Sequence, residues 1–354
     1  MTALPDDDLT RILESVADGR SLTAGEAERA FDAFMDGSAS EVQMAGLLLG
    51  LRAKGIAPSE VAGGVRALRK AMLPVRYADP DALVDTAGTG GGAVATFNIS
   101  TAAAFVVAGT GVPVAKHGNR SFTSRSGSAD VLEALGVRID LTPERMAAVL
   151  TEAGIVFMFA PLLHPAMKHV GPVRRELGVT TIMNILGPLT NPAGARRQVV
   201  GVADVRLLEL IPRALQELGH LRALVVHGSP GMDEVSPLGP TRVAELVGSE
   251  IRDYTLDPRE LGVEPSDAAD LAGGDPVDNA AIIEAVLAGD TRGTPRAAVV
   301  LNAAAAILVA DRADSWPDAM ALAERVIDAG DARRALDALR VASNADGVRV
   351  NTSG

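Results

Sequence analysis

A glycine-rich segment between a predicted strand and a predicted helix could bind an anionic ligand. The apolar run 82–85 predicts a strand, and Gly88–Gly92 follows it with backbone that can adopt positive φ and lie close to a ligand. Asn98 and Ser100 then open a helical run over 102–108. The N-terminus of such a helix presents free N–H groups and the positive end of its dipole. Together these features predict a phosphate-binding site.

A second unit of the same kind follows immediately. The predicted strand 112–115 leads into Lys116–Arg120, which reads Lys-His-Gly-Asn-Arg. A row of hydroxyl side chains comes next: Ser121, Thr123, Ser124, Ser126 and Ser128. One glycine-rich turn alone is as often a tight turn as a phosphate site, but two adjacent units with a lysine and hydroxyl donors favour a phosphate-rich ligand. The spacing matches neither the nucleotide-binding phosphate loop nor the dinucleotide fingerprint, so an ATPase or a dehydrogenase is disfavoured.

The proline-rich segment 157–193 suits a different ligand. It contains His164, His169 and the adjacent pair Arg174 and Arg175 within apolar surroundings. An apolar pocket with one fixed arginine suits a small aromatic carboxylate, because guanidinium pairs with carboxylate through two hydrogen bonds. The alternative is that these arginines only form an ion pair with Glu176 or solvate a helix. The two histidines are five residues apart, which is not the spacing of a helical metal-binding pair.

Two adjacent carboxylates form a third feature. Asp233 and Glu234 follow the predicted strand 222–227. Adjacent acidic residues on a loop can hold Mg²⁺ together with water and substrate phosphate oxygens. Surface acidity is the alternative, but ligands of open α/β sheets bind at the carboxyl ends of strands. We therefore expect a magnesium site here.

Composition excludes several classes of protein. The chain has 354 residues, a net charge of −12 and no cysteine, so a disulfide framework, a thiolate metal site and a thiol nucleophile are absent. The acidic balance argues against a general nucleic-acid binder. The longest apolar run, Ala303–Ala310, is far shorter than the roughly 18 residues of a membrane span. We expect a cytoplasmic protein that contacts neither nucleic acid nor membrane.

The periodicity of apolar residues divides the chain into a small and a large part. Residues 8–73 predict four amphipathic helices, with capping boxes at Thr23 with Glu26 and at Ser38 with Glu41. Helices of this size leave apolar surface uncovered, which favours packing on the rest of the chain and a homodimer. From residue 82 strands alternate with helices, which is typical of a largely parallel sheet covered by helices.

We expect an α/β protein with a small all-helical N-terminal domain and a large α/β domain built on a mainly parallel central sheet. Strands are predicted at 82–85, 112–115, 155–159, 198–203 and 222–227, with an antiparallel pair at Thr241–Val247 and Ile251–Leu256. The expected boundaries are 1–76 for the helical domain, joined by part of 161–190, then 77–342 for the ligand-binding α/β domain and 343–354 for a flexible tail.

Several motifs in this order and spacing resemble those of the anthranilate phosphoribosyltransferases of tryptophan biosynthesis. They are GTGG, NIST, KHGNR, PVRRELG, LGPLTNP and the late MDE. The resemblance extends from the helical N-terminus to about residue 340 and implies a fold like that of the nucleoside phosphorylases. It also implies a homodimer, a Mg²⁺ requirement, and transfer of the phosphoribosyl group from phosphoribosyl pyrophosphate (PRPP) to the nitrogen of anthranilate.

The resemblance assigns the site residue by residue. The PRPP site would comprise Gly88, Gly91, Gly92, Thr96, Asn98, Ile99, Ser100, Thr101, Lys116, His117, Gly118, Asn119, Arg120, Ser121, Phe122, Thr123, Ser124 and Ser128. Anthranilate would contact Gly88, Asn119, Arg174, His117, Pro161, His164 and Met167, and magnesium would bind Ser100, Asp233 and Glu234. No conventional catalytic side chain is expected, because positioning and electrostatics, assisted by Lys116, suffice for a substrate with an activated anomeric carbon.

The sequence departs from the family at one point, and three other readings stay open. The family's loop reads GTGG followed by Asp, whereas Gly92 stands in that place here and Ala93 replaces a usual glycine. This difference bears on how metal is held. A pyrimidine nucleoside phosphorylase, a non-catalytic nucleic-acid-binding relative and a transferase acting on another aromatic amine are the alternatives. The acidic charge and the Asp233–Glu234 pair argue against the second.

Overall fold

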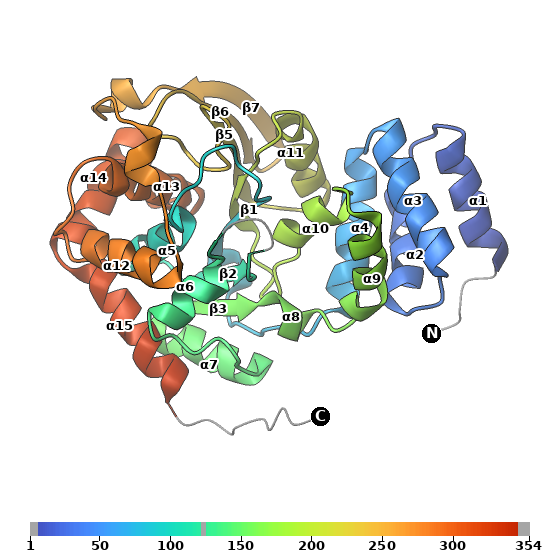
Figure 1. Cartoon of the computed structure of the whole chain (residues 1–354), viewed down its shortest axis with the longest axis horizontal. Helices are drawn as coiled ribbons and strands as arrows, with labels where there is room; N and C mark the ends of the chain where they lie inside the picture. The colour runs from blue at the N-terminus through green and yellow to red at the C-terminus, as the bar shows by residue number, and fades with distance from the viewer. Residues whose placement is uncertain (1–5, 122–124, 346–354) are drawn as a thin grey trace.

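The computed structural model describes residues 6–121 and 125–345 and places a small helical lobe beside a larger α/β lobe (Figure 1). The helical lobe consists of α1 (Asp6–Ala17), α2 (Ala24–Met35), α3 (Glu41–Lys54) and α4 (Pro58–Ala71). The capping box of Thr23 and Glu26 is present as predicted. The second predicted box was wrong: α3 begins after Ser40, which pairs with Gln43, so the true cap lies two residues later.

A buried ion pair stabilises the helical lobe. Lys54 Nζ lies 2.7 Å from the carboxylate of Glu60, and both side chains are almost completely buried. The same carboxylate accepts hydrogen bonds from the backbone N–H groups of Leu22 and Ala57, each at 2.8 Å. A buried charge needs such partners to offset its desolvation. The pair therefore joins the end of α3 and the start of α4 to the turn before α2.

The large lobe contains a single seven-stranded sheet, which confirms the predicted fold class. The strands are β1 (Val84–Gly88), β2 (Val114–Gly118), β3 (Ile155–Phe159), β4 (Arg197–Gly201), β5 (Arg222–Gly228), β6 (Thr241–Val247) and β7 (Glu250–Leu256). Their spatial order is β3-β2-β1-β4-β5-β6-β7. The first five strands pair in parallel, and β6 and β7 add an antiparallel edge as predicted.

Two strands lie further along the chain than predicted. The prediction placed them at 82–85 and 112–115, whereas β1 and β2 end at Gly88 and Gly118. A 3₁₀ turn, η1 (Pro80–Ala82), occupies the start of the first predicted segment. As a consequence the lysine and histidine after residue 115 are strand residues whose side chains alternate between the two faces of the sheet.

Helices cover both faces of this sheet. They are α5 (Ile99–Gly109), α6 (Ser128–Ala134), α7 (Pro143–Ala153), α8 (Ala160–Leu163), α9 (Met167–Leu177), α10 (Met183–Leu189), α11 (Leu207–Glu217), α12 (Pro276–Leu287), α13 (Thr294–Val309), α14 (Trp316–Asp328) and α15 (Asp331–Asn344). Two further 3₁₀ turns, η2 (Pro258–Leu261) and η3 (Ala268–Leu271), follow β7. The flexible tail predicted from 343 starts too early, because α15 includes Ser343, which is buried and accepts a hydrogen bond from Arg138 N. Residues 346–354 of that tail lie outside the described part of the chain.

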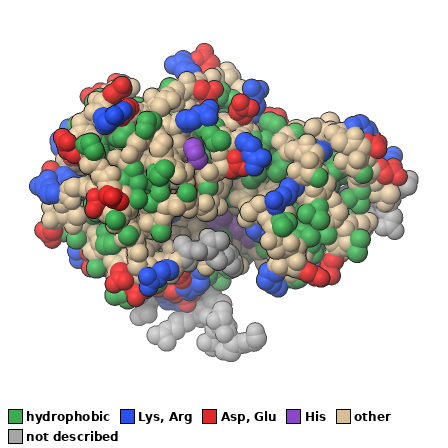
Figure 2. Space-filling model, turned by 45° about the horizontal axis from the view of Figure 1, so that its top comes forward, with side chains coloured by type: hydrophobic (Ala, Val, Ile, Leu, Met, Phe, Trp, Pro, Cys, Tyr) green, Lys and Arg blue, Asp and Glu red, His purple; other side chains and the backbone are tan. Residues whose placement is uncertain are grey.

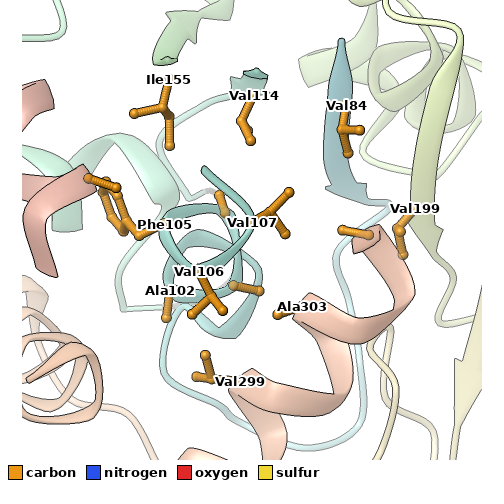
Figure 3. Packing of buried hydrophobic residues seen from close by; sticks show 14 of the residues in the cluster. Val84, Ala102, Phe105, Val106, Val107, Val114, Ile155, Val199, Val299 and Ala303 are labelled. Carbon is orange, nitrogen blue, oxygen red and sulfur yellow. The ribbon is translucent and has the colours of Figure 1, made fainter. Parts of the chain in front are cut away.

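Helix α5 is the centre of the main core. Its residues Phe105, Val106 and Val107 lie among strand and helix side chains that include Val84 and Val299 (Figure 3). A second core lies on the other face of the sheet, where α9, α10 and α11 pack with the helical lobe. Within the described residues, no helix is both long and apolar enough to cross a membrane.

Candidate active site

The predicted site residues gather where β1 and β2 end and α5 begins. Gly88 and Gly118 are the last residues of the two parallel strands, and Asn98 precedes the first residue of α5. Figure 2 shows a hollow between the two lobes with histidine visible inside it. The structure therefore brings the first two glycine-rich units together at one edge of the sheet, as ligand sites of open α/β sheets require.

Asp233 is enclosed by glycines of the loop. Its Oδ2 accepts a hydrogen bond from Gly90 N at 3.0 Å. A Cβ atom at Gly88 would lie 2.9 Å from one carboxylate oxygen of Asp233, and a Cβ atom at Gly92 would lie 2.7 Å from the other. At Gly201 a Cβ atom would overlap the backbone oxygen of Asp233 at 1.7 Å. The glycines are thus required because the acidic residue occupies the space beside the loop.

Glu234 lies beside the start of α5. Burial and the neighbouring Asp233 raise the pKa of Glu234 to about 8, although Lys116 and the nearby backbone of Ser100 oppose the shift. Burial also raises the pKa of Asp233. One amide expected to face an anionic ligand, that of Gly90, is therefore bonded to a carboxylate of the protein, and the second carboxylate lies close to the N-terminus of α5.

Asn302, which the sequence analysis missed, holds this acidic segment in place. From α13 its side chain accepts from Val235 N and donates to Val235 O, both at 2.9 Å. A cavity of about 10 Å³, enough for one water molecule, lies between this residue, Ser100, Asp233 and Glu234. The sequence feature that could have identified Asn302 is its position as an asparagine inside a long apolar helix.

The donor set fits Mg²⁺. No cluster of three or more potential metal-ligating side chains occurs among the described residues, but Asp233, Glu234 and Ser100 line the same small cavity. Mg²⁺ binds through one or two carboxylates and completes its shell with water and substrate phosphate oxygens. Two crowded, partly buried carboxylates with raised pKa values are what a divalent cation would stabilise.

Lys116 lies beneath the loop. Its Nζ donates to Thr86 O at 2.6 Å and lies 3.2 Å from Thr86 Oγ1 and 3.3 Å from Ser100 Oγ. Burial lowers the pKa of Lys116, and the charges of Asp85 and Glu234 oppose that shift. The ammonium group thus touches the hydroxyl proposed to bind metal and stabilises the negative charges on either side of it.

Asp85 carries the buried charge that organises this edge, a role that the sequence analysis did not assign. Its carboxylate accepts from His117 N at 3.2 Å, Asn191 Nδ2 at 2.8 Å and Gln198 Nε2 at 3.1 Å. Asn191 Nδ2 also donates to Ala115 O at 2.8 Å. Burial raises the pKa of Asp85, which these donors and Lys116 oppose. Strands β1, β2 and β4 are therefore tied together at one carboxylate.

Two histidines from separate elements meet above β2. The Nε2 atoms of His117 and His164 are 3.2 Å apart. Burial lowers the pKa of His117 to about 3 and that of His164 to about 4. Both rings are therefore neutral near pH 7, and the Nε2–H of one donates a hydrogen bond to the Nε2 of the other. Pro161 lies nearby in α8 and is exposed, and Met167 begins α9 half-buried.

Arg120 does not face the loop in this structure. Its guanidinium bonds to Asp130 and Glu133 of α6, each at 2.6 Å, and lies over the ring of Phe159. Ser128 donates its hydroxyl hydrogen to Asn119 O at 3.2 Å. The remaining predicted residues are distributed as follows: Gly91, Gly92 and Thr96 in the loop, Ile99 and Thr101 buried in the first turn of α5, Ser121 described and partly buried, and Phe122, Thr123 and Ser124 outside the described residues.

Arg174 lies in α9 with its guanidinium half-buried. Burial lowers its pKa. Among the described residues, its side chain forms no ion pair or hydrogen bond, although the chain carries a net charge of −12. The alternative that Arg174 pairs with Glu176 is therefore not seen. An unpaired, partly desolvated guanidinium beside an apolar segment is suited to a carboxylate ligand.

Known sequence families match both lobes. Residues 10–72 match the family described as glycosyl transferase family, helical bundle domain, and residues 80–333 match glycosyl transferase family, a/b domain. The anthranilate phosphoribosyltransferase of Thermomicrobium roseum is 51% identical over 339 residues, covering 94% of this chain and 97% of the relative. That of Rubrobacter xylanophilus is 50% identical over 329 residues, covering 93% and 96%.

Solved structures of anthranilate phosphoribosyltransferases also resemble this chain. A crystal structure of anthranilate phosphoribosyltransferase from Thermus thermophilus is 43% identical, with a TM-score of 0.89, and the match covers 94% of this chain and 99% of that one. The enzyme from Saccharomyces cerevisiae in complex with PRPP and Mg is 25% identical, with a TM-score of 0.87, covering 97% and 99%.

The Asp85 cluster predicts a large loss of stability when one donor is removed. Asn191→Ala would remove one of the three hydrogen-bond donors to a buried carboxylate and the side-chain donor to the Ala115 carbonyl, which should cost about 2–4 kcal/mol of unfolding free energy. Urea unfolding followed by circular dichroism measures this cost. Asn344→Ala, which removes two exposed hydrogen bonds, is the control and should cost about 1 kcal/mol or less. Equal losses for both variants would show that Asp85 does not depend on Asn191.

Proposed function

We infer the function from family membership, because this chain belongs to the anthranilate phosphoribosyltransferases. It transfers the phosphoribosyl group of PRPP to the amino group of anthranilate, giving N-(5-phosphoribosyl)anthranilate and pyrophosphate in tryptophan biosynthesis. The observation that carries the assignment of roles is that Asp233 and Glu234 lie against the glycine loop and the start of α5, with Asp233 accepting a hydrogen bond from Gly90 N. A site that holds both anion-binding amides and carboxylates suits an anionic ligand that arrives with a cation.

We propose that the pyrophosphate of PRPP lies against the Gly88–Gly92 loop and the N-terminus of α5. Gly90 and Gly91 have φ values of 70° and 81°, a conformation that exposes successive N–H groups and is strained for other residues. Lys116 is close enough to Ser100 for its charge to act on the same place. The hydroxyl and amide groups of 118–121 would then hold the ribose and its phosphate.

The reaction requires no strong acid or base from the protein. The amine nitrogen of anthranilate attacks the anomeric carbon, the bond from that carbon to a pyrophosphate oxygen breaks, and the nitrogen loses a proton after bonding. Negative charge grows on the leaving group, so fixed N–H groups and Lys116 stabilise the transition state more than the bound substrate. When bound, Mg²⁺ supplies further positive charge to the departing pyrophosphate.

We propose that Arg174 orients anthranilate. Its guanidinium would bind the carboxylate, while Pro161 and Met167 cover the ring. His117 and His164 can each offer a neutral hydrogen-bonding nitrogen, and because their pKa values are about 3 and 4 they place no competing positive charge beside the substrate. Arg174 would then hold the anthranilate carboxylate in one place, which would position the anthranilate amine for attack.

We propose further that the chain acts as a cytoplasmic homodimer, with a helical domain over 1–76 joined by part of 161–190 and an α/β domain that follows from residue 77 and includes all of α15. Val42 and Leu49 lie on one face of α3 and are 82% and 42% exposed. They supply an apolar surface on the helical lobe that a second copy could cover. The packing of α9 and α10 with the helical lobe supports joining part of 161–190 to that domain.

Purified protein should consume anthranilate only when PRPP and a divalent cation are both present. Loss of anthranilate fluorescence measures the rate, and release of pyrophosphate in equal amount identifies the reaction. EDTA should abolish consumption, and added Mg²⁺ should restore it. Thymidine or uridine cleavage with phosphate, in the absence of anthranilate consumption, would instead indicate a nucleoside phosphorylase.

Arg174→Ala should lower kcat/KM for anthranilate. The expected loss of transition-state stabilisation is about 2–4 kcal/mol, the scale of a lost charge-assisted pair. The KM for PRPP should stay within about twofold of the original protein, because the lost contact is to the other substrate. Steady-state kinetics with each substrate varied in turn tests this. Arg175→Ala is the matched control, since Arg175 is the exposed neighbour. Equal losses for both substrates would make Arg174 structural.

Gly92 should determine how the enzyme responds to excess magnesium. A Cβ atom there would lie 2.7 Å from the Asp233 carboxylate, so Asp at this position would place a third negative charge beside the pair and create an additional cation site. The original protein should therefore tolerate high Mg²⁺, whereas the rate of Gly92→Asp should fall beyond its optimum. Initial rates against Mg²⁺ at fixed PRPP measure the difference.

Gly92→Asn separates charge from size in this experiment. Asparagine meets the same Asp233 oxygen but adds no charge, so its rate should not decline at high Mg²⁺ even if its maximum is lower. Superimposable magnesium profiles for the Asp and Asn variants would contradict the charge argument and leave loop conformation as the reason for glycine.

A further inference from the structure

Asn279 is a buried polar residue to which none of the functions described so far assigns a role. It lies in the first turn of α12 and is 2% exposed. Its Nδ2 donates to Asn98 Oδ1 at 3.0 Å, and its Oδ1 accepts from Gly274 N at 2.7 Å. Both polar atoms of the Asn279 carboxamide are therefore hydrogen-bonded. Its oxygen bonds to Gly274 in its own chain segment, and its nitrogen bonds to Asn98, the N-cap of α5.

The orientation of Asn98 depends on this contact. Asn98 is the N-cap of α5, but its side chain does not cap its own helix. Instead its Nδ2 donates to Ser126 O at 3.2 Å, and its Oδ1 accepts from Ser126 Oγ at 3.3 Å as well as from Asn279. If the Asn98 carboxamide were reversed, two NH₂ groups would face each other and its oxygen would face a carbonyl oxygen. The Asn279 donor thus fixes which way Asn98 points.

The backbone around Asn279 is packed against the same place. Phe97 N donates to Leu271 O at 3.0 Å. A Cβ atom at Gly273 would lie 2.9 Å from both Cα and N of Phe97 and 2.8 Å from Asn279 Oδ1, so only glycine allows this approach. The segment from Leu271 to Asn279 therefore forms a close contact with the two residues that precede α5.

We propose that Asn279 is a positioning residue for PRPP, acting through the Asn98 side chain, which links the start of α5 to Ser126 at the end of the loop before α6. This inference rests on the proposed function, in which both the α5 N-terminus and the segment after Lys116 contact PRPP. Asn279 does not touch the substrate. It fixes the spacing between two elements that must bind the same molecule, and a shift of about 1 Å at such elements is costly for catalysis.

The test compares the two substrates. Asn279→Ala should raise the KM for PRPP by about five- to tenfold, the scale of one lost buried hydrogen bond, while the KM for anthranilate at saturating PRPP changes less than twofold. Asn279→Asp should have at least as large an effect, because its carboxylate repels Asn98 Oδ1. Ser343→Ala removes a buried hydrogen bond in α15 and is the control for general destabilisation: it should lower the melting temperature without changing either KM.

A double-mutant cycle with Asn98 distinguishes positioning from a general structural role. If Asn279 acts through Asn98, then Asn98→Ala combined with Asn279→Ala should raise the KM for PRPP no more than Asn98→Ala alone. Additive effects, or equal losses for both substrates, would overturn the proposal. Asn279→Ser, which keeps a small polar side chain, replaces Asn279→Ala if the latter does not fold. Absence of activity in the unaltered protein would refute the proposed function rather than this inference.

Discussion

The negative charge of Asp85, enclosed between three strands, is the constraint on which the architecture of the site depends. A carboxylate in this position is stable only if several donors and a nearby cation offset its desolvation. The donors come from β2, from the segment after α10 and from β4, and the cation is Lys116. Two of these contacts involve proposed ligand-binding residues: the backbone of His117 at the end of β2, and Lys116 beneath the loop that follows β1.

Carboxylates held by nearby donors also occur closer to solvent than Asp85. Asp233 accepts a hydrogen bond from Gly90 N, which would otherwise be open to a phosphate, and Glu234 lies near the start of α5. Burial and Asp233 raise the pKa of Glu234 to about 8 because they disfavour its charge. A divalent cation shared with an anionic substrate would remove that penalty, since it would neutralise the carboxylates and the phosphates together. In the proposed site, metal and substrate binding would thus be linked by electrostatics.

Sequence reasoning predicted the succession of strands and helices along the chain and the antiparallel edge, because these depend on local periodicity and local turn chemistry, but it ended β1 and β2 three residues too early. It missed contacts between distant residues: Asn191 and Gln198 reach Asp85 from 106 and 113 positions away, and Asn279 reaches Asn98 from 181. Arg120 shows a different limit. Its motif suggests a ligand contact, which stays a prediction, and the sequence did not reveal that two carboxylates on α6, 10 and 13 residues later, bind its guanidinium in this structure. A side chain's type does not reveal which of several possible partners geometry favours.

The two proposed substrates depend on different hydrophobic cores. The start of α5 belongs to the core around Phe105, whereas Arg174 is on α9, whose Val170 and Val173 pack in the core shared with the helical lobe. The cores are joined near the segment after α10, where Arg69 of α4 donates to Leu189 O and Asn191 reaches Asp85. Attack requires the amine and the anomeric carbon to be aligned within a fraction of an ångström. In the proposed site that alignment would therefore depend on contacts that join the two cores, among them those of Arg69 and Asn191, because neither core alone would hold both substrates.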